Sequence, residues 1–144
     1  MGRDVMKRRK APTPKRSAPA PKRRFPAPVL ALLRESRMLG VRAGADDHRF
    51  TGIWFVLVGD RLLVRPWNDD AAGWHRTFLE EKRGAISVSG REIPVRAKPV
   101  RSEATFDAMD AAYARKYDTK GSQQWVRGFR TAKRRRTTTE LLPV

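Results

Sequence analysis

Residues 51–67 read TGIWFVLVGDRLLVRPW, and this stretch decides the fold. Two runs rich in β-branched, aromatic and other apolar side chains, 51–58 and 61–67, are separated only by Gly59-Asp60. A two-residue connection with glycine first suits the type II′ turn of a β-hairpin. The stretch therefore predicts two antiparallel strands joined by a tight turn.

A second hairpin is predicted downstream, where residues 85–88 and 92–100 flank Ser89-Gly90-Arg91. Near the end of the chain, Thr137–Leu142 has β propensity and is expected to close the sheet as a last strand. Two hairpins bridged by a helix indicate a barrel. We therefore expect an α+β fold, a small antiparallel β-barrel with flanking helices.

The segment before the first hairpin has two interpretations. Residues 29–39 show apolar side chains at helical spacing, with Leu32, Leu33 and Leu39 expected to face inward. Residues 38–43 equally suit a short first strand, and the sequence alone does not separate the two.

Three further helices are predicted from spacing and capping residues. One starts near Ala71, with Asn68–Asp70 as candidate caps. The clearest covers 105–117, with Ser102 or Thr105 as its N-cap, and a short one covers 123–129.

Positive charge is concentrated at the start of the chain. Residues 1–28 hold ten of the 32 Lys and Arg residues, one acidic residue and six of the ten prolines. Such a segment buries too little apolar surface to offset the entropy of ordering it. We predict a disordered basic tail at 1–28 and a folded domain at 29–144.

Composition excludes several classes of protein. The chain has no cysteine, which rules out disulfides, thiolate metal sites and a cysteine nucleophile and fits a reducing cytoplasm. Prolines and charges interrupt the basic start, so it does not read as a signal peptide. No apolar run approaches the length of a membrane span. A cytoplasmic protein without a membrane span is expected.

Familiar catalytic patterns are absent from the sequence. Asp46-Asp47-His48 are three adjacent loop residues and make a poor metal shell, so no metal site is predicted. The sequence has no Gly-x-Ser-x-Gly elbow and no Gly-rich phosphate loop of standard spacing. A self-contained hydrolase is not indicated.

A basic and aromatic group of residues is the candidate ligand site. Arg65 and Trp67 end the second strand of the first hairpin, and Trp74 and Arg76 begin the next helix. Guanidinium groups near a helix start can hold an anion, and tryptophan can stack on a planar ring. The alternative is that both tryptophans belong to the core and Arg65 is a solvent-side strand residue.

Several short motifs carry a family resemblance. They are His48-Arg49-Phe50, Ile53-Trp54, Arg65-Pro66-Trp67, Gly73-Trp74-His75, the string GREIPVRA at 90–97, AAYARKY at 111–117 and TTTEL at 137–141. With these motifs the chain resembles the pyridoxamine-5′-phosphate-oxidase-like split β-barrels, which bind flavins. Within them it is similar to an uncharacterised bacterial family related to the deazaflavin-dependent nitroreductases.

The resemblance implies a cofactor, its contacts and a reaction class. It implies FMN or deazaflavin, an oxidoreductase that passes electrons from a nicotinamide donor to a small acceptor, and a homodimer. The backbone of 55–57 would line the flavin ring, and His48 or His75 would assist proton transfer. Side-chain contacts to the phosphate or ring would come from Arg49, Arg65, Trp67, Trp74 and Arg76.

Two departures from the deazaflavin enzymes favour FMN. Pro66-Trp67 replaces their Ser-Lys-type pair, and Ala45-Asp46-Asp47 replaces a basic loop. Carboxylates there would repel a polyanionic deazaflavin tail. A barrel that binds no cofactor stays open as an alternative.

A nucleic-acid function is the rival interpretation, with the barrel as a scaffold. Basic residues along the tail can neutralise phosphates without reading sequence. Lys133–Arg136 forms a second basic cluster. The tail residues expected to contact nucleic acid are Lys7, Arg8, Arg9, Lys10, Lys15, Arg16, Lys22, Arg23 and Arg24.

Overall fold

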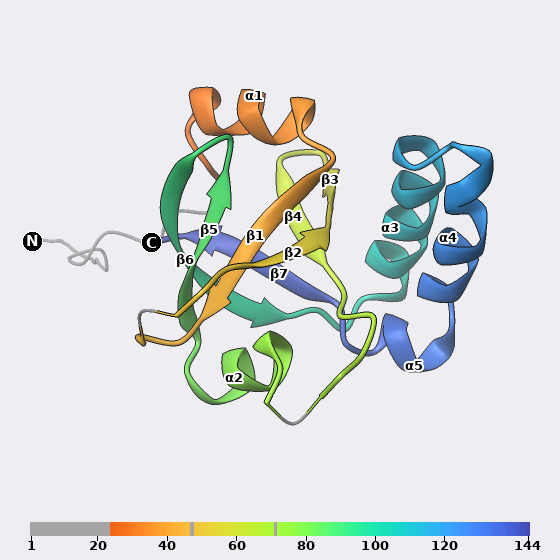
Figure 1. Ribbon diagram of the computed structural model, residues 1–144. Coiled ribbons are helices and arrows are strands. Elements are labelled where there is room, and N and C mark those ends of the chain that lie inside the picture. The colour runs from red at the N-terminus through yellow and green to blue at the C-terminus, as the bar shows by residue number, and fades with distance from the viewer. Residues whose placement is uncertain (1–23, 47, 71) are drawn as a thin grey trace, which may run out of the picture.

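The computed structural model describes residues 24–46, 48–70 and 72–144. Within them, seven antiparallel strands form one sheet in the order β2-β1-β5-β6-β7-β4-β3, which curls into a nearly closed barrel (Figure 1). The predicted α+β barrel is therefore confirmed. The strands are β1 (Met38–Ala43), β2 (Thr51–Trp54), β3 (Val56–Val58), β4 (Arg61–Val64), β5 (Arg83–Val88), β6 (Arg91–Pro99) and β7 (Thr139–Pro143).

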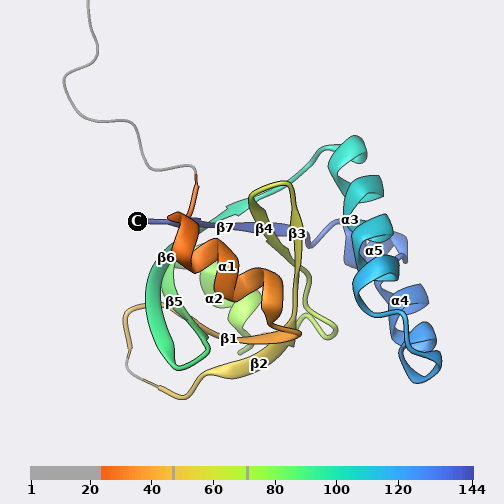
Figure 2. The ribbon, with the colours of Figure 1, turned by 90° about the horizontal axis from the view of Figure 1, so that it is seen from above.

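Helices cover both ends and one side of the barrel. α1 lies over one end and α2 over the opposite end, whereas α3, α4 and α5 stack together beside β3 (Figures 1 and 2). No helix in the described part of the chain is long and apolar enough to cross a bilayer. The helices are α1 (Ala27–Glu35), α2 (Trp74–Glu80), α3 (Glu103–Lys116), α4 (Gln123–Phe129) and α5 (Ala132–Arg135), with a 3₁₀ turn at Lys120–Ser122.

Both predicted hairpins form. Gly59 has φ of 61° and Asp60 does not share the positive value, as a type II′ turn requires. In the second hairpin Ser89 (φ 48°) and Gly90 (φ 77°) are both left-handed, which fits a type I′ turn. Arg91 pairs with Val88, so this turn has two residues rather than the three predicted.

The barrel stays open along one seam. β2 runs into β3 through Phe55, but the pairing partner changes there: Trp54 pairs with Met38 of β1, and Val56 pairs with Leu63 of β4. β2 and β3 are the two terminal strands of the sheet. The outer edge of β2 therefore faces the segment that follows β4 instead of another strand.

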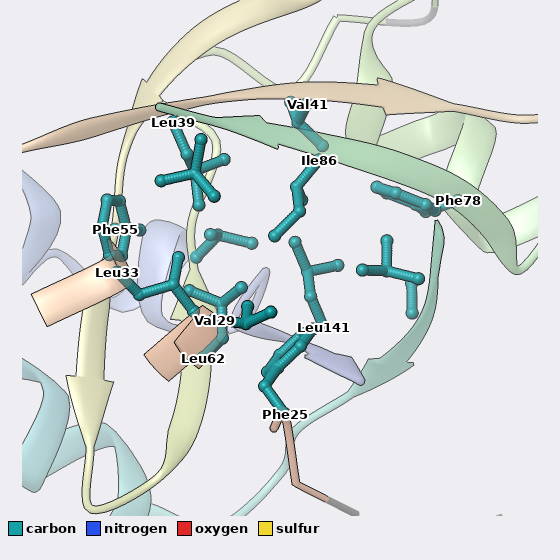
Figure 3. Close-up of a cluster of buried hydrophobic side chains, with 14 of the residues drawn as sticks. Phe25, Val29, Leu33, Leu39, Val41, Phe55, Leu62, Phe78, Ile86 and Leu141 are labelled. Carbon is teal, nitrogen blue, oxygen red and sulfur yellow. The ribbon is translucent and has the colours of Figure 1, made fainter. Parts of the chain in front are cut away.

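The barrel interior is filled from the strands and from α1. Val41, Ile86, Leu62 and Leu141 come from four strands, and Leu33 of α1 is packed onto them with no exposed surface (Figure 3). Burying a leucine side chain of this size contributes about 2 kcal/mol. The apolar stripe of α1 thus closes one end of the barrel.

Tertiary pairing resolves the ambiguity at 29–43. Residues 38–43 form β1 because they are held between β2 and β5. Leu39 is therefore buried as a strand residue and not as the end of a helix. Leu33 is buried on α1 as predicted, whereas Leu32 is only partly buried.

The fold begins earlier than the boundary predicted at residue 29. Phe25 is 3% exposed and belongs to the core, and α1 starts at Ala27 with proline in its first turn. Proline is tolerated there because the first amides of a helix have no intrahelical acceptor. Residues 24–28 are thus part of the domain. The rest of the predicted tail, residues 1–23, lies outside the described residues.

A side-chain N-cap is present at the start of α3 but absent at the start of α2. The Ser102 hydroxyl accepts a hydrogen bond from the Thr105 amide, and α4 has the bounds predicted for it. α2 begins at Trp74 with Gly73 as its N-cap, and no side chain from Asn68–Asp70 caps it. The short helix α5 has no counterpart in the predicted elements.

Candidate functional site

Arg65 is a buried structural residue rather than a surface ligand for phosphate. Its side chain has no exposed area, and Nη1 lies 2.6 Å from Asp110 Oδ1 on α3. Nε donates to Thr138 Oγ1 at 2.8 Å, and Nη1 also donates to the Phe129 carbonyl at 2.9 Å. These contacts join strand β4 to the α3–α4 layer. The guanidinium is therefore already engaged and is not presented to a ligand.

The two predicted tryptophans border one cleft at the open seam, here called the seam cleft. It consists of two adjoining hollows of about 310 and 430 Å³ that share Gly52, Ile53 and Trp67. Both sizes fall in the range of small-molecule sites. The first is also lined by Met38, Trp54, Arg65, Trp125 and Phe129, and the second by Val41, Ala43, His48, Thr51, Asn68, Asp70, Ala72, Gly73, Trp74 and Thr77.

Trp67 is held rigidly between α4, α5 and the seam. Its ring makes edge contacts with Trp125 and Phe129, with centroids 4.8 and 5.2 Å away. The Arg134 guanidinium stacks 3.6 Å from the ring centroid. A Cβ on Gly128 would lie 2.2 Å from the ring, so only glycine permits this approach. The indole is therefore fixed before any ligand arrives.

Arg76 and His75 are occupied by a carboxylate. His75 Nδ1 lies 2.8 Å from Asp69 Oδ1, and Arg76 Nε lies 3.0 Å from Asp69 Oδ2. Burial alone would raise the pKa of Asp69, but the hydrogen bonds from His75 and Arg76 outweigh it and lower the pKa. The positive charge of Arg76 is consequently offset at the start of α2.

The loop before β2 brings His48, but not Arg49, to the cleft. Arg49 is exposed and does not line either hollow. His48 lines the second hollow, with Nε2 3.1 Å from the Ala43 carbonyl and Nδ1 3.1 Å from the Arg49 carbonyl. Of the residues predicted to bind the cofactor, Trp67 and Trp74 line this space, and Arg65 borders it with a buried side chain.

A basic hollow adjoins the seam cleft on the other side of the Trp67–Asp70 loop. It measures about 460 Å³ and is lined by Lys133 and Arg134 as well as by the loop. Arg134 donates to the carbonyls of Trp67 and Gly128, at 2.8 and 3.0 Å. Lys133 is exposed and makes no ion pair with a described residue. It is an exposed cation of the hollow that adjoins the cleft.

Phe55, where the strand pairing changes, is clamped by α3. The Tyr117 hydroxyl accepts from the Phe55 amide at 3.1 Å and lies 3.0 Å from the Phe55 carbonyl, and its ring stacks on Trp54 with centroids 3.8 Å apart. Lys116 Nζ also donates to the Phe55 carbonyl, at 3.0 Å. Burial raises the pKa of Tyr117 to about 12 and, with Arg37 nearby, lowers that of Lys116 to about 7.

The clamp changes which backbone can meet a ligand. Residues 55–57, predicted to line a flavin ring, are engaged by the clamp and by pairing with β4. The strand that borders the seam cleft is β2, through Gly52, Ile53 and Trp54. The cleft is therefore bordered by residues just before the predicted stretch, and the flavin contact itself stays a prediction.

Comparison with known proteins places the chain in a family. Residues 30–141 match the family described as "Uncharacterized protein conserved in bacteria (DUF2255)". The chain belongs to DUF2255. The predicted likeness to an uncharacterised bacterial family is thereby confirmed, and the link of this DUF2255 chain to flavin-binding proteins stays a prediction.

A solved structure shares the fold. The crystal structure of conserved hypothetical protein Rv2991 from Mycobacterium tuberculosis is similar to this DUF2255 protein, with a TM-score of 0.56 and 12% sequence identity. The match covers 89% of this chain and 84% of the mycobacterial chain. None of the curated proteins matches. At this identity the likeness concerns the fold alone.

Proposed function

We propose that this DUF2255 protein binds a planar, phosphate-bearing heterocycle of the FMN type in the seam cleft and serves in electron transfer to a small acceptor. The observation that supports this best is the free edge of β2 facing Trp67 and Trp74 across the cleft. The family resemblance of the sequence motifs adds the chemical class.

The shape and chemistry of the cleft suit a flat heterocycle. An edge strand presents backbone amides and carbonyls that have no partner strand, and these can pair with the donors and acceptors of a flavin ring. The indoles of Trp67 and Trp74 add planar apolar surface for stacking. The ring would lie along Gly52 and Ile53, which line both hollows of the seam cleft.

The surrounding charges favour a short, singly phosphorylated tail. Lys133 lies across the Trp67–Asp70 loop and can meet one phosphate. Asp70 lines both the seam cleft and the basic hollow, so a longer polyanionic tail would pass a carboxylate. FMN fits this arrangement better than a deazaflavin with an extended acidic tail.

The chain's own groups would bind and orient the cofactor rather than perform covalent chemistry. A bound flavin supplies the electron transfer. Trp67 and Trp74 would hold the ring and β2 would fix its edge, and proton transfer assisted by His48 stays a prediction of the resemblance. The nicotinamide donor and the homodimer implied by the resemblance stay predictions.

Binding is tested by titrating the full chain with FMN and with riboflavin, following flavin fluorescence. We expect FMN to bind more tightly, and Lys133→Gln to weaken FMN by about tenfold while leaving riboflavin unchanged, as the loss of one charged hydrogen bond implies. Gly52→Leu should block both ligands by filling the cleft. The matched control is Gly121→Leu, because a Cβ at Gly121 meets nothing within 4 Å. The proposal is refuted if neither FMN nor riboflavin binds the wild-type chain.

A further inference from the structure

A second surface, on the outer face of β5 and β6 and beside the β3–β4 turn, carries unbalanced positive charge. Strand register places Arg83 of β5 directly opposite Arg96 of β6. Lys98 lies two residues further along β6 and therefore on the same face. Like charges directly opposite one another destabilise a sheet pair. The Arg83–Arg96 pair thus carries an electrostatic cost, whereas Lys98 lies opposite Glu140 of β7 in the register.

The surface is hollowed as well as charged. A concavity of about 760 Å³ is lined by four cations and two carboxylates, together with Val58, Gly59 and Leu142. The cations are Arg24, Arg61, Arg96 and Lys98, and the carboxylates are Asp60 and Glu140. We call this concavity and the adjoining Arg83 the β6 face.

Both carboxylates of the β6 face are already neutralised. Glu140 lies 3.0 Å from Arg61 Nη2. Asp60 lies 3.3 Å from Arg24 Nη1 and 2.9 Å from Arg34 Nη2. Among the described residues no carboxylate is within ion-pair distance of Arg83, Arg96 or Lys98. These three cations remain available for an external anion.

From this arrangement we propose that the β6 face binds the phosphate backbone of duplex nucleic acid without reading its sequence. A polyanion would turn the repulsion between Arg83 and Arg96 into attraction. The concavity has no aromatic lining residue, so it offers no platform for stacking unpaired bases. Its apolar lining is limited to Val58 and Leu142, which gives little for a membrane or an apolar protein surface to bury.

The chain around the β6 face supports the same partner. Arg24 lines the concavity, and the sequence before it, residues 1–23, contains nine further Lys and Arg residues. A phosphate backbone seated on Arg96 and Lys98 would therefore lie close to the point where this basic segment joins the domain.

The size of the effect follows from counterion release. Each phosphate contact contributes a slope of about 0.9 in log affinity against log salt, or about eightfold in affinity at 0.1 M relative to 1 M salt. The double variant Arg96→Gln/Lys98→Gln removes two contacts. It should weaken binding by about sixtyfold at 0.1 M salt and reduce the salt slope by about 1.8.

The test is fluorescence anisotropy of a labelled 30-base-pair DNA duplex with the full chain, between about 0.05 and 0.3 M salt, the range over which such slopes are resolved. The matched control is Arg115→Gln/Lys120→Gln, which removes the same charge from exposed positions on the side of α3 and α4. We expect this control to retain most of the affinity and slope. Thermal unfolding of the Arg96→Gln/Lys98→Gln variant should be unchanged or shifted upward, because a repulsive pair is relieved.

Three outcomes would overturn the proposal. One is a wild-type chain that does not bind the duplex. Another is an equal loss in both double variants, which would mean that net charge and not the β6 face sets the affinity. The third is tighter binding to a single strand of the same length, which would require a stacking surface that the β6 face lacks.

Discussion

Replacement of Asp110 by alanine tests whether Arg65 is structural. The Arg65 side chain is completely buried, and its Nη1 lies 2.6 Å from Asp110 Oδ1. Removing one partner of a buried ion pair leaves an uncompensated charge and lowers the free energy of unfolding by roughly 3–5 kcal/mol. The Thr138 hydroxyl and the Phe129 carbonyl still accept from the guanidinium in the variant. We therefore expect the lower end of that range, about 3 kcal/mol.

The measurement is urea unfolding followed by tryptophan fluorescence, with thermal unfolding as a second probe. A loss of about 3 kcal/mol corresponds to a fall in melting temperature of about 12 °C for a domain of this size. The matched control is Asp107→Ala, one helical turn earlier on α3. The Asp107 side chain, which pairs with Arg135, is 74% exposed. Its removal should lower the free energy of unfolding by less than about 1 kcal/mol. Both variants change helix propensity equally.

The reasoning would be refuted by an Asp110→Ala variant as stable as Asp107→Ala. Such a result would mean that the buried Arg65 does not depend on its carboxylate partner for stability. A further check is Arg65→Leu/Asp110→Leu. This double variant buries no charge and should be more stable than Asp110→Ala.

Two further predictions concern the clamp and the fixed tryptophan. The pKa of Lys116 falls to about 7 in the folded protein, whereas the unfolded chain binds this proton up to about pH 10.5, so wild-type stability should rise between pH 7 and 9. Lys116→Met should flatten that rise. A pH slope of Lys116→Met identical to that of the control Lys120→Met would contradict this prediction. Gly128→Ala should displace Trp67, shift tryptophan emission and lower the melting temperature despite a gain in helix propensity of about 1 kcal/mol, whereas Gly121→Ala should change neither.

The hairpins could be predicted because their signals are local. The turn residues at Gly59 and Gly90 stand between runs whose pattern itself indicates strands. Residues 38–43 carry no such local signal. They form a strand because β2 and β5 pair with them from either side, and that pairing depends on segments far along the chain.

The candidate site was only partly accessible to sequence reasoning, for the same physical reason. Trp67 and Trp74 are close in sequence, and both border the seam cleft. Arg65 was misread because its partner Asp110 lies 45 residues away on another layer. Asp110 follows Met109 on the buried side of α3, and a carboxylate in that position was the available signal for a buried cation.

The position of β7 has a consequence for how the chain folds. β7 lies between β6 and β4, so it alone joins the β2-β1-β5-β6 part of the sheet to the β4–β3 hairpin. During synthesis β7 is the last described strand to leave the ribosome. Until it does, β6 and β4 both expose strand edges that can pair with other chains. Closure of the barrel is therefore a late, long-range step, and the nascent protein is most prone to aggregation immediately before it.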